Sequence, residues 1–166
     1  FQDPDPVRAL KEQMEKARND PTTPDTRLSD NPNPLNPATI GSLVELMLGG
    51  MAPRHGCPLH CRLRYFDPAQ KRAGMPEGVG ALVERLEVNS TTVVLVNTDQ
   101  VAGREVIVQG GAYAEHRFDT VTIDGKVSKV DGTSFAVALA PGAGARLKIA
   151  MSRYASPPTF AFPWDR

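Results

Sequence analysis

The spacing of apolar residues changes from a helical period to a strand period near residue 61, and this change constrains the fold most strongly. Beyond it, apolar and polar residues alternate in short runs such as TSFAVAL and ARLKIAM, as in half-buried β-strands. Asp124-Gly125 and Asp131-Gly132 separate such runs, and Asp-Gly pairs favour tight hairpins. No helical crossover lies between the runs, so the strands are expected to be antiparallel. The sequence therefore predicts a mainly β fold, an antiparallel β-sandwich of about eight strands.

Two short helices and a Pro-rich arm are predicted before this sandwich. The first helix begins at Asp5-Pro6, because Asp caps a helix and proline suits its first position. The second helix begins at Asn36-Pro37 and ends at Gly49-Gly50. The stretch between them, TTPDTRLSDNPNPLNP, has no apolar period and many prolines. It is therefore expected to be a linker or an arm laid over another surface.

The chain divides into a helical, Pro-rich N-terminal arm (1–60), a β-sandwich (61–153) and an aromatic, Pro-rich C-terminal tail (154–166). Both ends carry apolar side chains that a sandwich of this size would not easily cover, so they are predicted to hold a partner. The predicted interface residues are Leu10, Met14, Tyr154, Phe160, Phe162 and Trp164. The alternative for the tail is that it folds back over its own sandwich.

The composition excludes some classes of partner. Nineteen Lys and Arg residues balance nineteen Asp and Glu residues, so no basic surplus attracts nucleic acid. The longest apolar run, residues 40–48, is shorter than the roughly 18 residues of a membrane span. The chain begins at Phe1 without an initiator Met, so we expect a processed product or a piece of a longer chain. Its compartment stays open: the cytoplasm, or export through an upstream signal.

The heptapeptide HGCPLHC, residues 55–61, holds both cysteines and two of the three histidines. Its candidate metal ligands are His55, Cys57, His60 and Cys61. Zinc usually takes two separated pairs of ligands, so a distant residue such as His116 would have to complete a site here. A disulfide between the cysteines would need a tight turn, and a catalytic cysteine would need a base in place. The simplest interpretation is a loop that enters a strand, with Cys61 as a small buried side chain.

Three further residues are candidates for binding. His116 could reach a groove, or it could be a hydrogen-bonding residue at a strand edge. Arg62 and Arg64 alternate with apolar residues and could form an anion-binding edge, or only a solvated face. The glycine-rich stretches match neither GxxxxGK[ST] nor GxGxxG, so no cofactor is expected.

Three stretches suggest a family: VVLVNTD (93–99), the following REVIVQGG, and FAVALAPGAGARLKI (135–149). Together, residues 80–152 resemble the C-terminal β-sandwich domains appended to large bacterial carbohydrate-active enzymes. The resemblance implies a sandwich that packs on a catalytic domain and carries no catalytic residue itself. It covers less than half of the chain, and residues 1–60 match no known pattern.

The function expected from these features is a non-catalytic small subunit or accessory domain on a larger, carbohydrate-active chain. The assembly would be a hetero- or homo-oligomer, and its chemistry would belong to the partner. One alternative is a carbohydrate- or ligand-binding sandwich. The other is an enzyme that uses His55, Cys57, His60 and Cys61.

Overall fold

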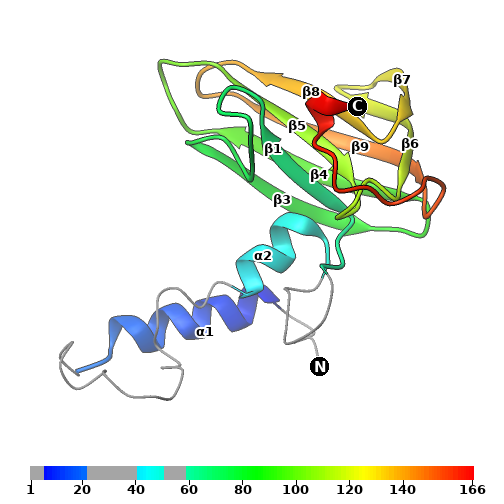
Figure 1. The fold of residues 1–166 in the computed structure, drawn as a ribbon. Helices are drawn as coiled ribbons and strands as arrows, with labels where there is room; N and C mark the ends of the chain where they lie inside the picture. The colour runs from blue at the N-terminus through cyan, green and yellow to red at the C-terminus, as the bar shows by residue number, and fades with distance from the viewer. Residues whose placement is uncertain (1–5, 22–40, 51–58) are drawn as a thin grey trace.

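The computed structural model describes residues 6–21, 41–50 and 59–166 (Figure 1). Its strands form two antiparallel sheets, of order β2-β1-β5-β8 and β3-β4-β9-β6-β7. The strands are β1 (Leu63–Asp67), β2 (Arg72–Ala73), β3 (Val79–Leu86), β4 (Ser90–Asn97), β5 (Arg104–Gly110), β6 (Arg117–Ile123), β7 (Lys126–Gly132), β8 (Ser134–Leu139) and β9 (Gly144–Ser152). The predicted mainly β fold, an antiparallel sandwich behind two short helices, is confirmed.

The core lies between the two sheets, because alternate residues of each strand face inward. Its buried side chains are Leu63, Tyr65, Val93, Leu95, Val106, Val108, Phe118, Val121, Val137, Leu139, Leu147, Ile149 and Met151. Full burial of each large aliphatic or aromatic side chain contributes about 1.5–3 kcal/mol. This core explains why the fold does not depend on disulfides.

One of the two Asp-Gly hairpin predictions is confirmed and the other is wrong. Asp124 and Gly125 both have positive φ, at 49° and 77°, and join β6 to its neighbour β7 in a tight turn. Asp131 also has positive φ, but there the chain leaves the five-stranded sheet, and β8 pairs with β5 instead. The reason is burial: β7 is largely exposed, so a strand beside it would lie beyond the core, whereas pairing with β5 buries Val137 and Leu139.

The helices lie outside the sandwich. Helix α2 (Gly41–Leu48) packs on β3 and β1, and its Met47 and Leu48 reach the core. Helix α1 (Pro6–Arg18) packs beside α2, and most of it extends away from the sheets (Figure 1). The predicted caps at Asp5 and Asn36 lie outside the described residues. Neither described helix is long and apolar enough to cross a membrane.

The C-terminal tail folds back along its own sandwich and ends in a short 3-10 helix, η2 (Pro163–Asp165). Phe162 and Trp164 stack on each other, with ring centroids 4.9 Å apart, and both meet Phe66 edge-on at 6.0 Å. Phe66 lies on the outer face of β1 and is nevertheless only 2% exposed. The tail therefore covers a patch of its own sheet. Whether it also contacts a partner stays a prediction.

Candidate functional site

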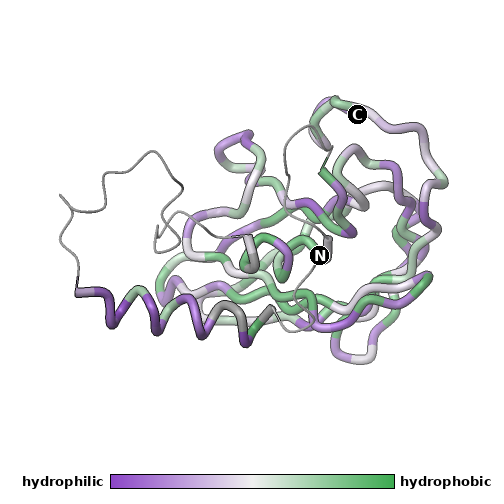
Figure 2. Tube along the Cα trace, turned by 90° about the horizontal axis from the view of Figure 1, so that it is seen from below, coloured by the Kyte–Doolittle hydropathy of each residue, from purple (hydrophilic) through white to green (hydrophobic). Residues whose placement is uncertain are grey.

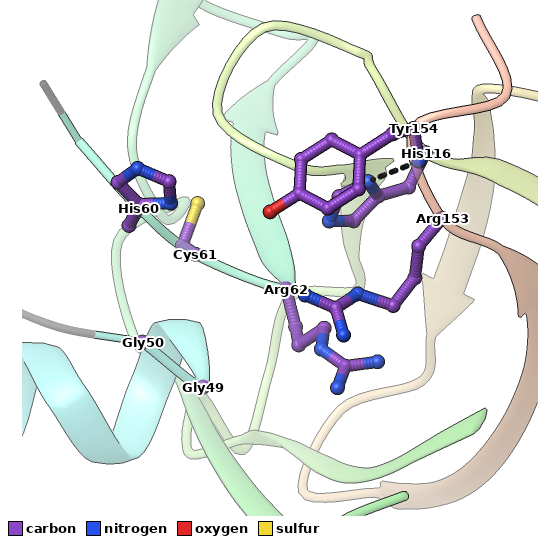
Figure 3. Close-up of a pocket in the computed structure, with 8 residues that line it drawn as sticks. All are labelled: Gly49, Gly50, His60, Cys61, Arg62, His116, Arg153 and Tyr154. Atoms are coloured by element: carbon purple, nitrogen blue, oxygen red, sulfur yellow. Dashed lines mark hydrogen bonds between the residues drawn. The ribbon is translucent and has the colours of Figure 1, made fainter. Parts of the chain in front are cut away.

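A pocket of about 280 Å³ lies where four distant segments of the chain meet. These segments are the end of α2, the approach to β1, the loop before β6 and the start of the tail (Figure 3). The residues that line it are Gly49, Gly50, His60, Cys61, Arg62, His116, Arg153 and Tyr154. The fold thus brings together three of the predicted site residues that carry side-chain nitrogen atoms: His60, Arg62 and His116.

Two glycines and two hydrogen bonds fix the end of α2 against β1. Gly49 ends the helix with a φ of +63°, and a Cβ on Gly50 would lie only 2.0 Å from the carbonyl oxygen of His60. The amide of Arg62 donates to the carbonyl of Leu48 at 2.9 Å. The buried Tyr65 hydroxyl donates to the carbonyl of Met47 at 2.7 Å. The predicted stop at Gly49-Gly50 is therefore confirmed, and it doubles as a wall of the pocket.

Two arginines give the pocket its charge. Arg62 donates to the carbonyl of Val88 at 3.3 Å, and the guanidinium of Arg153 lies 5.2 Å from the ring centroid of Tyr154. No ion pair of the described residues includes either arginine. Burial, followed by repulsion from Arg153, lowers the pKa of the Arg62 guanidinium below its usual range. The two like charges thus lie close together without a carboxylate between them.

His116 is buried in the wall of this pocket, with 2% of its surface exposed. Its Nδ1 accepts a hydrogen bond from the amide of Tyr154 at 3.2 Å, and its ring meets the Tyr154 ring edge-on at 4.8 Å. Burial lowers the pKa of the imidazole, although the neighbouring Glu115 opposes this shift. The imidazole is therefore neutral at pH 7, and it holds the start of the tail in place.

Cys61 is buried and forms no disulfide, which agrees with the prediction of a small buried side chain. Burial, and to a lesser degree Glu115, raises the pKa of its thiol to about 12. A protonated thiol is neither a nucleophile nor a metal ligand.

The neighbouring His60 is exposed on the other side of the backbone. No group of three metal-ligating side chains occurs within the described ranges. His55 and Cys57 lie outside those ranges, so metal binding by the whole cluster stays a prediction.

Arg64 does not join Arg62 at an anion-binding edge. It donates to the carbonyl of Ala112 at 2.7 Å, and its guanidinium lies 5.0 Å from the ring centroid of Phe66. It therefore supports the patch under the tail, in a second, smaller pocket with Phe160 and Phe162. Residues i and i+2 of a β-strand lie on one face but about 6.6 Å apart. Here that distance puts Arg62 in the first pocket and Arg64 under the tail.

Sequence reasoning missed Arg153 as a site residue. It lies just after β9, where the alternating pattern stops, and its neighbour Tyr154 was predicted only as an interface residue. A basic residue next to an aromatic one at the end of a strand could have drawn attention to this position. Its place in one pocket with Arg62 depends on long-range packing that no local pattern contains.

Comparison with protein-family models, with curated proteins and with solved structures finds no match to this chain. The resemblance to accessory domains of carbohydrate-active enzymes therefore stays a prediction.

Proposed function

We propose that this chain is a non-catalytic small subunit or accessory domain that binds a larger protein chain through helix α1. The observation that carries the proposal is the exposure of two apolar side chains of α1. Val7 is 46% and Met14 is 58% exposed, and they lie seven residues apart, on one face of the helix.

The helix has little support of its own. A helix of 13 residues is only marginally stable in water, because most helical stability in proteins comes from packing of an apolar face. Of the described elements, α1 packs mainly against α2. Figure 2 shows α1 as mainly hydrophilic, with short hydrophobic stretches between. A partner that covers this narrow stripe would supply the missing packing.

The charge of α1 indicates what kind of surface its partner should present. The helix carries four basic and two acidic side chains, an excess of two positive charges, and Lys16 and Arg18 lie in its last turn. The partner is therefore expected to present an apolar groove with an acidic rim, since complementary charge steers association. The resemblance of residues 80–152 adds the expectation that this partner acts on carbohydrates.

The candidate site supports a role without chemistry of its own. The Cys61 thiol is protonated at neutral pH, and the neutral His116 already accepts a hydrogen bond at Nδ1. The described pocket therefore offers no activated nucleophile.

Site-specific photo-crosslinking in the organism that makes the chain tests this proposal. A benzoylphenylalanine in place of Met14 is expected to crosslink one larger protein. The same group in place of Val127 is the control, because that residue of β7 is 66% exposed on the sandwich. The purified partner should then bind the full chain and bind Met14→Glu at least about tenfold more weakly. Crosslinks from Met14 only to a second copy of this chain, or equal binding of Met14→Glu, would contradict the proposal.

A further inference from the structure

The pocket of about 280 Å³ beside the end of α2 has a use that partner binding through α1 does not explain. Figure 3 shows the guanidinium groups of Arg62 and Arg153 beside each other, with the Tyr154 ring above them. The groups come from opposite ends of the sandwich domain, one before β1 and one after β9. Folding thus brings two positive charges to one wall of an open pocket.

We propose that this pocket binds a divalent tetrahedral oxyanion, a phosphate or sulfate group, between Arg62 and Arg153. The group can be a free ion or the end of a small molecule, since the chemistry that recognises it is the same.

Charge supports this assignment. Two guanidinium groups at close range repel each other, and a dianion between them would turn that repulsion into two charge-assisted contacts. The residues that line the pocket include no Asp or Glu, and the Cys61 thiol is protonated, so neither brings a negative charge. Glu115 acts on Cys61 and His116 from outside the lining residues, and its carboxylate accepts a hydrogen bond from the amide of Tyr113 at 2.7 Å.

Geometry supports it as well. The planar, forked donors of arginine match the oxygens of phosphate and sulfate, and such bonds are among the strongest that side chains make. The Arg62 guanidinium uses only Nη1 in its contacts with the carbonyl of Val88 and the sulfur of Met151. Its other N–H groups have no hydrogen-bond partner among the described residues. The Arg153 guanidinium lies over the Tyr154 ring and makes no hydrogen bond among these residues.

The size of the pocket limits the ligand. Pockets for drug-sized molecules measure about 300–1,000 Å³, so a pocket of about 280 Å³ lies at the lower end. A free oxyanion or a small monoester fits, whereas a polymer would have to leave most of its length outside.

Titration calorimetry on the full chain at pH 7.5 tests the proposal, with inorganic phosphate, sulfate, glycerol phosphate and acetate as probes. Phosphate is mainly a dianion at this pH. We expect saturable binding of phosphate and sulfate, and binding of the monovalent acetate at least about tenfold weaker. Tighter binding of glycerol phosphate than of inorganic phosphate would assign the site to an ester, and the reverse would assign it to the free ion.

Variants locate the site. Arg153→Gln and Arg62→Gln should each weaken phosphate binding at least about tenfold, since each removes a charge-assisted contact. Arg146→Gln is the matched control, because this β9 arginine pairs with Glu84 on the surface at 2.7 Å and should leave binding unchanged. Arg153 is exposed, so its variant is expected to fold even if Arg62→Gln does not. The absence of saturable phosphate binding, acetate binding as tight as phosphate, or an equal loss in Arg146→Gln would each overturn the proposal.

Discussion

The two ends of the chain carry similar apolar side chains but have different environments. At the C-terminus, Phe162 and Trp164 meet Phe66 of the same chain. At the N-terminus, Val7 and Met14 of α1 remain about half exposed. The sequence predicts a partner for both ends. The difference teaches that an apolar side chain needs a matching apolar patch within reach: Phe162 and Trp164 find one on β1, whereas Val7 and Met14, like Phe160 of the tail at 90% exposed, do not.

The sheet provides that patch at one position. Phe66 occupies the outer face of β1, where a solvated strand would carry a polar residue, and Arg64 lies against its ring. Arg166 then holds the end of the tail: its guanidinium donates to the Thr133 hydroxyl at 3.1 Å and to the side-chain oxygen of Gln109. Helix α1 has no comparable anchor on the sandwich within the described residues.

The largest effect is expected from Phe66→Ala, which removes the patch. The loss of a buried phenylalanine costs about 3–5 kcal/mol of unfolding free energy. Trp164, the single tryptophan of the chain, should then move into water and shift its fluorescence emission to longer wavelength before global unfolding. Val127→Ala on β7 is the control and should change stability by less than about 0.5 kcal/mol. An unchanged emission maximum in Phe66→Ala would contradict the docking of the tail.

A somewhat smaller effect is expected where the helices join the sandwich. Gly50→Ala places a Cβ against the backbone of His60, which cannot move aside without disturbing β1, so we expect a loss of about 2 kcal/mol or more. Gly80→Ala is the matched control, because a Cβ there meets nothing within 4 Å. Urea unfolding of both variants measures the difference. Equal midpoints for the two variants would show that α2 does not depend on this close approach.

Alkaline pH should weaken the same junction through Cys61. Its thiol has a pKa of about 12 in the folded chain and an ordinary value of 9.0 when unfolded. Because the folded state keeps its proton longer, this contribution is fully present below pH 9 and is lost as pH rises toward 12. In a Cys57→Ser background, Cys61→Ala should therefore show a flatter fall of unfolding free energy between pH 9 and 11. Parallel curves would mean that the buried thiol is not responsible.

The smallest effect is expected from Met14→Glu at the other end of the chain. The residue is 58% exposed, so the isolated chain should change in stability by less than about 0.5 kcal/mol. Thermal unfolding of this variant beside Phe66→Ala measures the contrast between the ends directly. A loss above about 1 kcal/mol would show that α1 is already packed within the chain.

The sandwich could be predicted because its determinants are local. Alternating runs and the Asp124-Gly125 turn each lie within a few neighbouring residues. The turn at Asp131-Gly132 was mispredicted because the pattern does not say to which sheet the next strand belongs. That choice depends on an apolar face formed by strands far away in the sequence.

The candidate site could be predicted only in parts. His60, Arg62 and His116 were each candidates, but their meeting with Arg153 depends on long-range contacts. The covered outer face has one local sign in the sequence RLRYFD. Arg62 and Arg64 occupy alternate positions on the outer face, and the next such position is apolar, Phe66.

The attachment of α2 to β1 has a mechanical consequence. Two hydrogen bonds, from the Arg62 amide to Leu48 and from the Tyr65 hydroxyl to Met47, join the last turn of α2 to the sheet. Tension applied to the helices by a bound partner would therefore enter the sandwich at the start of β1. At that end β1 is paired with β5, with Leu63 opposite Gly110, whereas β2 pairs only with the far end of the strand, so the load would pass first into the pairing of β1 with β5.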